Sequence, residues 1–156
     1  MPNWGYSITG LDPDKTVKAS GRELRVSPKA AREVCKSIKG MKLDAAKFFL
    51  QQVILKRSPV PFRRYKKNVG HRSGFQRAYS GRYPVKAARK ILEVLENSEV
   101  NAEFAGFELE RLRIIHASAY PGIKIRKYIP RAFGRATRYF KPLCHVEVVL
   151  EQMEET

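Results

Sequence analysis

Apolar residues recur at helical spacing in three stretches of the chain and predict three helices. The first is expected over residues 27–40, because a serine-proline pair at its start and a glycine at its end are typical helix boundaries. The second is expected over 43–56, and a longer third over 84–101. The side chains expected to face the core are Ala31, Val34, Cys35, Ile38, Ala46, Phe49, Leu50, Val53, Val85, Ala88, Ile91, Leu92, Leu95 and Val100.

Ahead of the first helix, the sequence is typical of turns. Residues 6–21 contain Gly10, an Asp-Pro-Asp run at 12–14 and Gly21. Only 23–26 is predicted to form a strand, a short one with two apolar side chains on one face.

The last third of the chain changes to the two-residue period of a strand. Apolar and polar side chains alternate from 112 to 118 and again from 145 to 150. The one proline-to-glycine turn candidate near the midpoint is 130–134, and pairing around it would place His116 opposite Val149. Each arm then has about 17 residues and spans on the order of 50 Å. A domain of this size cannot cover such a ribbon, so its outer part is expected to project.

Residues 58–84 break the helical pattern and show no sustained period. A loop of this length is normally functional or disordered, and its aromatic content argues against disorder. Its mixture of basic residues and rings suits RNA, because cations contact phosphates while flat rings stack on unpaired bases. The rings could equally pack the loop onto the core, and different rings could do either. They are Phe62, Tyr65, Phe75, Tyr79 and Tyr83.

The charge of the chain is strongly positive and unevenly distributed. Lys and Arg total 31 against 15 Asp and Glu in 156 residues, a net charge of +16. Residues 58–90 hold ten basic and no acidic side chains, and 111–142 hold nine basic and none acidic. Because ordinary soluble surfaces mix both signs, these blocks indicate an anionic partner. Nucleic acid is favoured over anionic lipid and acidic proteins, since neither a lipidation signal nor an amphipathic anchor is evident.

Composition excludes several classes of protein. A hydrophobic fraction of 43% argues against wholesale disorder, and the apolar runs are too short to span a bilayer, so we expect no membrane partner. No secretory signal is visible at the N-terminus. Two cysteines cannot provide a disulfide framework and are typical of reduced thiols in a cytosolic protein.

Catalytic chemistry finds little support in the sequence. The histidines His71, His116 and His145 are scattered, and in a strand Cys144 would face away from His145. Neither a paired-carboxylate site nor a glycine-rich phosphate motif is evident. We therefore expect no enzyme activity, no metal and no cofactor. The alternatives to RNA binding are an architectural DNA-binding protein, whose ribbon would grip a groove, and a nuclease or RNA-modifying enzyme, which the missing carboxylate or metal constellation disfavours.

Residues 126–150 resemble the signature of the universal large-subunit ribosomal protein family numbered twenty-two. Two basic residues five positions apart precede a small residue, a glycine and an arginine, and a strand follows after nine further residues. These positions are Arg126, Arg131, Ala132, Gly134, Arg135, His145, Val146, Val148 and Leu150. Residues 24–29, 39–40 and 97–103 are similar to the family's start and end of the first helix and the end of its long helix. Residues 58–84 look like the insertion of archaeal and eukaryotic members.

The resemblance implies an α+β fold, with about three helices packed on a small antiparallel sheet and a long projecting β-hairpin. It implies a single ribosomal protein domain over 1–156, with a basic insertion at 58–84 and the hairpin at about 111–150. Such a protein is a structural constituent of the cytoplasmic large subunit, supports its assembly and lines the nascent-peptide exit tunnel with its hairpin. The implied partners are large-subunit ribosomal RNA, neighbouring ribosomal proteins and the nascent polypeptide, and no homo-oligomer is expected.

The charge blocks and the resemblance together select the candidate site residues. The expected RNA contacts are Arg63, Arg64, Lys66, Lys67, Arg72, Arg77, Arg82, Lys86, Lys124, Arg126, Lys127, Arg131, Arg135 and Arg138. The expected hairpin tip is Pro130, Arg131, Ala132, Phe133, Gly134 and Arg135. Gly134 is expected to supply the positive φ of the turn.

Overall fold

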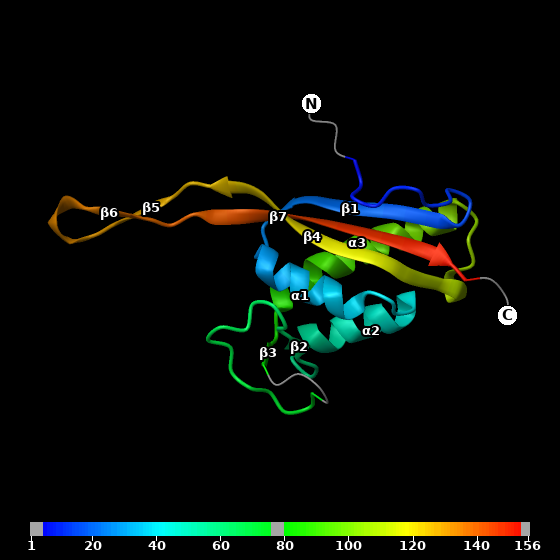
Figure 1. The fold of residues 1–156 in the computed structure, drawn as a ribbon, viewed down its shortest axis with the longest axis horizontal. Helices are drawn as coiled ribbons and strands as arrows, with labels where there is room; N and C mark the ends of the chain where they lie inside the picture. The colour runs from blue at the N-terminus through cyan, green and yellow to red at the C-terminus, as the bar shows by residue number, and fades with distance from the viewer. Residues whose placement is uncertain (1–4, 76–79, 154–156) are drawn as a thin grey trace.

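A three-stranded sheet and three helices form the body, and a long hairpin extends beyond them (Figure 1). The computed structural model describes residues 5–75 and 80–153. Within these residues the antiparallel sheet has the order β1-β7-β4, formed by β1 (Thr16–Leu24), β4 (Leu112–Ile125) and β7 (Lys141–Gln152). The α+β fold implied by the resemblance is confirmed.

The three predicted helices are present close to their expected bounds. They are α1 (Pro28–Ile38), α2 (Leu43–Ile54) and α3 (Val85–Phe104). Helices α1 and α3 pack against the sheet, and α2 packs against α3. The core that they enclose includes Ile38, Leu50, Ile91, Leu95, Leu112, Ile114, Val146, Val148 and Leu150.

The prediction that Val100 faces the core is wrong. Val100 is 60% exposed, whereas Ala102 is buried. At about 100° per residue, Val100 lies nine residues after the buried Ile91 and therefore on the opposite side of the helix.

The first strand is longer than the sequence pattern predicted and begins earlier. Residues 16–21 form part of β1 and pair with β7 from Thr16↔Glu151 to Gly21↔Val146, so the turn expected there is wrong. Gly21 looks like a turn residue in sequence, but its role is close packing. A Cβ at this position would lie 2.8 Å from Cγ2 of Val94 on α3. A glycine in a strand can allow a helix to pack closely because it has no side chain. From a single sequence, such a glycine cannot be distinguished from a turn glycine.

The hairpin has the predicted register. His116 pairs with Val149 in the ladder between β4 and β7. Farther out, β5 (Tyr128–Pro130) pairs with β6 (Ala136–Arg138), and the Arg131 N–H donates to the Arg135 carbonyl oxygen over 2.7 Å. Gly134 has φ +67°, as the turn requires. Phe133 has φ +58°, which is unusual for a residue with a side chain and was not expected.

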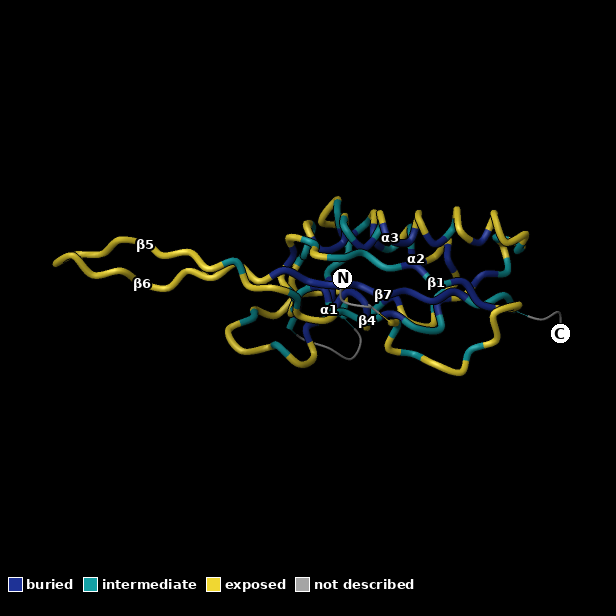
Figure 2. The backbone as a smooth tube through the Cα atoms, turned by 90° about the horizontal axis from the view of Figure 1, so that it is seen from above, coloured by how far each residue is buried: buried dark blue, intermediate teal, exposed yellow. Residues whose placement is uncertain are grey.

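Beyond the body, the two arms of the hairpin are exposed (Figure 2). Every residue from 126 to 142 is exposed, whereas every residue from 143 to 150, on the part of β7 inside the body, is buried. Isolated two-stranded ribbons are marginally stable in water, so a ribbon of this kind is expected to be supported by a partner.

Candidate nucleic-acid interface

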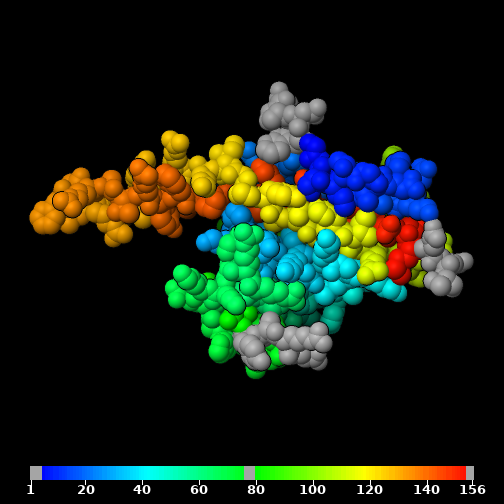
Figure 3. Space-filling view, viewed as in Figure 1, coloured from blue at the N-terminus to red at the C-terminus, as the bar shows by residue number. Residues whose placement is uncertain are grey.

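Two basic extensions leave the body toward the same end (Figure 3). One is the outer hairpin, residues 123–142, and the other is the insertion, residues 58–84. The hairpin carries exposed cations on both arms with no acidic side chain among them. These cations are Lys124, Arg126, Lys127, Arg131, Arg135, Arg138 and Lys141.

The insertion has a defined backbone although its sequence lacks a period. Its ends meet in the short pair β2 (Val60–Pro61) and β3 (Gly81–Arg82). Phe62 is 7% exposed and belongs to the core of the body. Across the loop, the Arg82 guanidinium donates to the Asn68 carbonyl oxygen over 3.0 Å.

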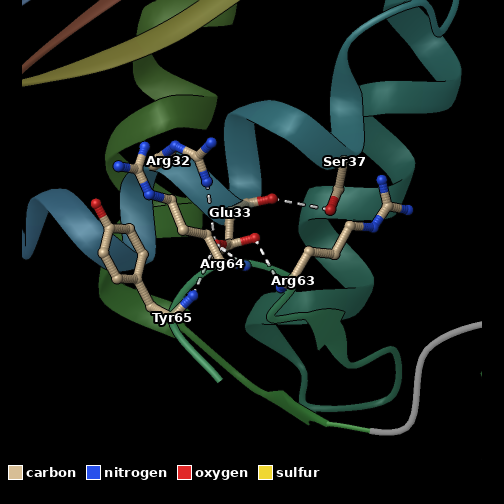
Figure 4. A network of polar contacts seen from close by, with 6 residues as sticks. All are labelled: Arg32, Glu33, Ser37, Arg63, Arg64 and Tyr65. Carbon is tan, nitrogen blue, oxygen red and sulfur yellow. Dashed lines mark hydrogen bonds and ion pairs between the residues drawn. The ribbon is translucent and has the colours of Figure 1, made fainter. Parts of the chain in front are cut away.

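A buried carboxylate on α1 holds the beginning of the insertion (Figure 4). Glu33 is 1% exposed, and its Oε atoms accept backbone N–H groups from Arg63 at 3.0 Å, Arg64 at 3.1 Å and Tyr65 at 3.4 Å. The Arg32 guanidinium adds a hydrogen bond of 3.3 Å. Because the bonds go to the backbone, the Arg63 and Arg64 side chains stay exposed.

Sequence reasoning missed Glu33. It stands outside the apolar stripe of α1, where a glutamate is normally solvated, and its partners lie about 30 residues away. No local pattern signals such a contact.

Of the two roles that the sequence left open for the rings of the insertion, packing onto the core is confirmed for Phe62, and stacking on RNA bases stays a prediction. Tyr65 and Tyr83 have cations of the same chain within 6 Å of their ring centres, close enough for cation–π attraction. Lys29, Arg32 and Arg64 approach Tyr65, and Arg72 approaches Tyr83 at 5.7 Å. Arg77 and Tyr79 lie outside the described residues.

Two basic grooves open on this side of the body, and Ser27 contributes to both. The insertion groove, about 790 Å³, lies between the start of α1 and the insertion. The junction groove, about 600 Å³, lies where the hairpin meets the body. The insertion groove is lined by Ser27, Lys29, Ala30, Phe62, Arg64, Tyr65, Lys66, Lys67, Val69, Arg82, Tyr83 and Pro84. The junction groove is lined by Arg25, Val26, Ser27, Lys86, Ile125, Lys127, Tyr139, Phe140, Lys141, Pro142 and Leu143.

The N-terminal ends of α1 and α3 add positive potential to these grooves. Neither helix has an acidic residue in its first turn or a side-chain hydrogen bond that caps its N-terminus. A helix N-terminus carries a partial positive charge and attracts anions. Lys29 and Lys86 stand in these first turns and reinforce that charge. Lys90, one turn later, is instead paired with Glu93 at 2.7 Å.

The grooves bring together predicted residues that are distant in sequence. Arg64, Lys66, Lys67 and Arg82 meet at the insertion groove, and Lys86 and Lys127 at the junction groove. Arg63 and Arg72 lie elsewhere on the insertion, and Arg77 lies outside the described residues. The remaining predicted residues lie along the hairpin. The sequence analysis missed the groove residues Arg25, Lys29, Tyr139, Phe140 and Lys141. The basic and aromatic mixture at 138–141 was a usable signal, of the same kind as that in the insertion.

The thiols and histidines serve packing and local hydrogen bonds. Burial raises the pKa of the Cys35 thiol far above its usual range and that of Cys144 to about 11, which suppresses the reactive thiolate. His145 accepts the Glu23 N–H at Nδ1 over 3.1 Å. Burial and the nearby Lys39 lower the pKa of His116. Among the described residues, no cluster of three or more His, Cys, Asp or Glu is placed to hold a metal ion.

Replacing Arg63, Arg64, Lys66 and Lys67 by alanine is expected to weaken RNA binding without loss of helix. In a salt titration of RNA affinity, the log–log slope should become less steep by roughly 3, at about 0.7 for each lost phosphate contact. Circular dichroism should show unchanged helical content, because exposed side chains rarely contribute more than about 0.5 kcal/mol each. The matched control replaces four exposed lysines of the body, Lys36, Lys39, Lys42 and Lys56. Unfolding of the insertion variant would show that these side chains are structural.

Within the described part of the chain, no helix is both long enough and apolar enough to cross a membrane.

A family model described as ribosomal protein L22p/L17e matches residues 19–151. A protein of Methanopyrus kandleri named large ribosomal subunit protein uL22 is 53% identical over 153 residues, which cover 96% of each chain. Proteins of the same name are 53% identical in Methanocaldococcus jannaschii, over 91% of each chain, and 46% identical in Ignicoccus hospitalis, over 99% of this chain and 100% of that one.

Proposed function

The chain belongs to the ribosomal protein L22p/L17e family, and from this premise we propose that it is a structural constituent of the cytoplasmic large ribosomal subunit. It binds large-subunit ribosomal RNA and supports assembly of the subunit. The family is structural rather than enzymatic. The relatives named above are ribosomal proteins of archaea, so the alternative of an architectural DNA-binding protein has no support among them.

The observation that carries this proposal is the pairing of two acid-free basic extensions on one end of the body. A single flat surface would suffice for nonspecific attraction to nucleic acid. Here an exposed ribbon and a folded loop border two grooves, which is a shape suited to irregular, folded RNA. The cations expected to contact phosphate are those named in the insertion and along the hairpin.

The outer hairpin has the form needed to enter a narrow passage through RNA. It is two strands wide, exposed from 126 to 142 and without acidic side chains. We propose that it lines the nascent-peptide exit tunnel, with 130–135 as its tip, and that the nascent polypeptide passes beside it. Residues 1–156 act as one domain, without a second copy of the chain. The body of this domain then contacts RNA and neighbouring ribosomal proteins.

Affinity for large-subunit ribosomal RNA is expected to fall steeply with salt. If the two extensions neutralise about 8 phosphates, the log–log slope should be near roughly −6, because bound cations release counterions from RNA. Filter binding of the full chain to folded large-subunit ribosomal RNA between moderate and high potassium chloride measures it. A slope close to zero would contradict an electrostatic interface.

Competition in the same assay separates RNA from DNA recognition. Unlabelled folded ribosomal RNA should displace the labelled RNA at much lower concentration than duplex DNA of equal phosphate content. Equal displacement by both would overturn the proposed function, since phosphate attraction alone does not distinguish the two polymers.

A further inference from the structure

The ladder of the hairpin is interrupted where the hairpin leaves the body. The last pair of β4 and β7 is Ile125↔Lys141, and the first pair of β5 and β6 is Tyr128↔Arg138. Two residues on each arm, 126–127 and 139–140, lie between these ladders. The Tyr139 N–H donates to the Lys127 carbonyl oxygen over 2.7 Å, so the arms stay together across the break.

This interruption places two rings beside the junction groove. Tyr139 is 51% exposed and Phe140 is 37% exposed, and both line the groove. Tyr128 and Phe140 make a T-shaped contact, with ring centres 6.2 Å apart and planes at 89°. Lys141 Nζ stands 5.8 Å from the centre of Tyr139. Phe140 is therefore held by a neighbouring ring, and Tyr139 carries a cation.

The rest of the groove combines apolar surface with positive charge. Val26 and Leu143 are buried beneath it, and Ile125 and Pro142 extend the apolar part. Four cations surround this surface, and among the residues that the structure describes no acidic side chain lines it. They are Arg25, Lys86, Lys127 and Lys141. A phosphate ion would not bind an apolar surface, and a purely apolar ligand would not bind four cations. The groove therefore suits a ligand that has both an apolar face and negative charge.

We propose that the junction groove binds one base extruded from single-stranded large-subunit ribosomal RNA. The base stacks on Phe140 above the apolar surface, while the phosphates on either side of it contact Lys86 and Lys127. The groove volume of about 600 Å³ lies within the roughly 300–1,000 Å³ of small-ligand sites, which suits a single nucleotide. The inference rests on the proposed function and adds to it the place and mode of a base contact.

The test uses the full chain, folded large-subunit ribosomal RNA and the variant Phe140→Ala. Loss of a stacking ring should weaken binding roughly five- to a hundredfold. Phe140→Tyr keeps the ring and should bind like the unaltered protein. Phe48→Ala removes a ring that is 63% exposed on α2 and lines neither groove, and it should have no effect.

Ultraviolet cross-linking followed by mass spectrometry identifies the contact directly. The peptide containing Tyr139 and Phe140 should carry one nucleotide, and that adduct should disappear in Phe140→Ala. Either wild-type affinity of Phe140→Ala or an adduct found only elsewhere overturns the inference. Reduced affinity without an adduct in the unaltered protein also overturns it, because the ring would then act through packing.

Failure of this inference is distinguishable from failure of the proposed function. If the groove variant binds normally while the alanine variant of the insertion loses affinity, RNA binding stands and the base contact is wrong. If the unaltered protein prefers ribosomal RNA no more than duplex DNA, the function itself is wrong. Displacement of the RNA by an acidic peptide with an aromatic residue, at equal charge, would assign the groove to a protein partner and overturn the base contact.

Discussion

Glu33→Ala is expected to lower the thermal midpoint of unfolding by roughly 10 °C. The carboxylate is the acceptor for the N–H groups of Arg63, Arg64 and Tyr65, and it is buried. Its loss leaves donors without an acceptor in a poorly hydrated site, at about 1–3 kcal/mol for each unsatisfied group. A net cost of about 3–4 kcal/mol corresponds to a shift near 10 °C, at roughly 2–4 °C per kcal/mol for a chain of this size. Calorimetry measures the midpoint, and hydrogen exchange at 63–65 measures release of the insertion.

Two further variants make the Glu33 experiment specific. Glu96→Ala removes an exposed carboxylate from α3 and should change stability by no more than about 0.5 kcal/mol. The stability of Glu33→Gln should fall between those of Glu33→Ala and Glu96→Ala. Its amide keeps one acceptor oxygen, but its NH₂ group, which is a donor, replaces the other oxygen and faces the backbone N–H groups. An unchanged midpoint and unchanged exchange at 63–65 in Glu33→Ala would show that the insertion is held by its other contacts.

Deletion of residues 128–137, with the arms joined by Asn-Gly, is expected to leave a folded protein that still enters large subunits. The deleted residues are exposed, and Asn-Gly favours the tight turn that two antiparallel arms need. The effect should fall on the exit tunnel, where nucleotides that the tip covered become reactive to chemical probes. Footprinting of ribosomes that carry the deletion measures it, together with the response to nascent-chain stalling.

A double variant separates the effect of the volume of the hairpin tip from the effect of its charge. Arg131→Ala combined with Arg135→Ala keeps the turn, because the hydrogen bond that closes it joins backbone atoms. The double variant should leave fewer tunnel nucleotides reactive to chemical probes than the deletion does. If every tunnel-wall nucleotide keeps its reactivity in the deletion, the tip lies elsewhere and its placement in the tunnel is wrong.

The helices and the register of the hairpin follow from information that neighbouring residues carry. Apolar spacing located α1, α2 and α3, because one side of each helix must be buried against the sheet or another helix. Pairing around 130–134 gave His116↔Val149, because a hairpin with one distal turn leaves few alternative registers. The charge blocks needed no structure at all, since long acid-free segments are evident in the sequence itself.

Three features were decided only by the tertiary structure. Strand β1 looked like a turn because it contains Gly21, and only the packed structure shows that this glycine makes room for Val94 of α3. Glu33 looked like a surface residue because its partners are the backbone of a segment about 30 residues away. The junction groove joins residues near 25, 86 and 140, which no window of sequence contains. Periodicity reports which side of an element is buried, but which distant backbone or side chain it then meets depends on how the whole chain packs.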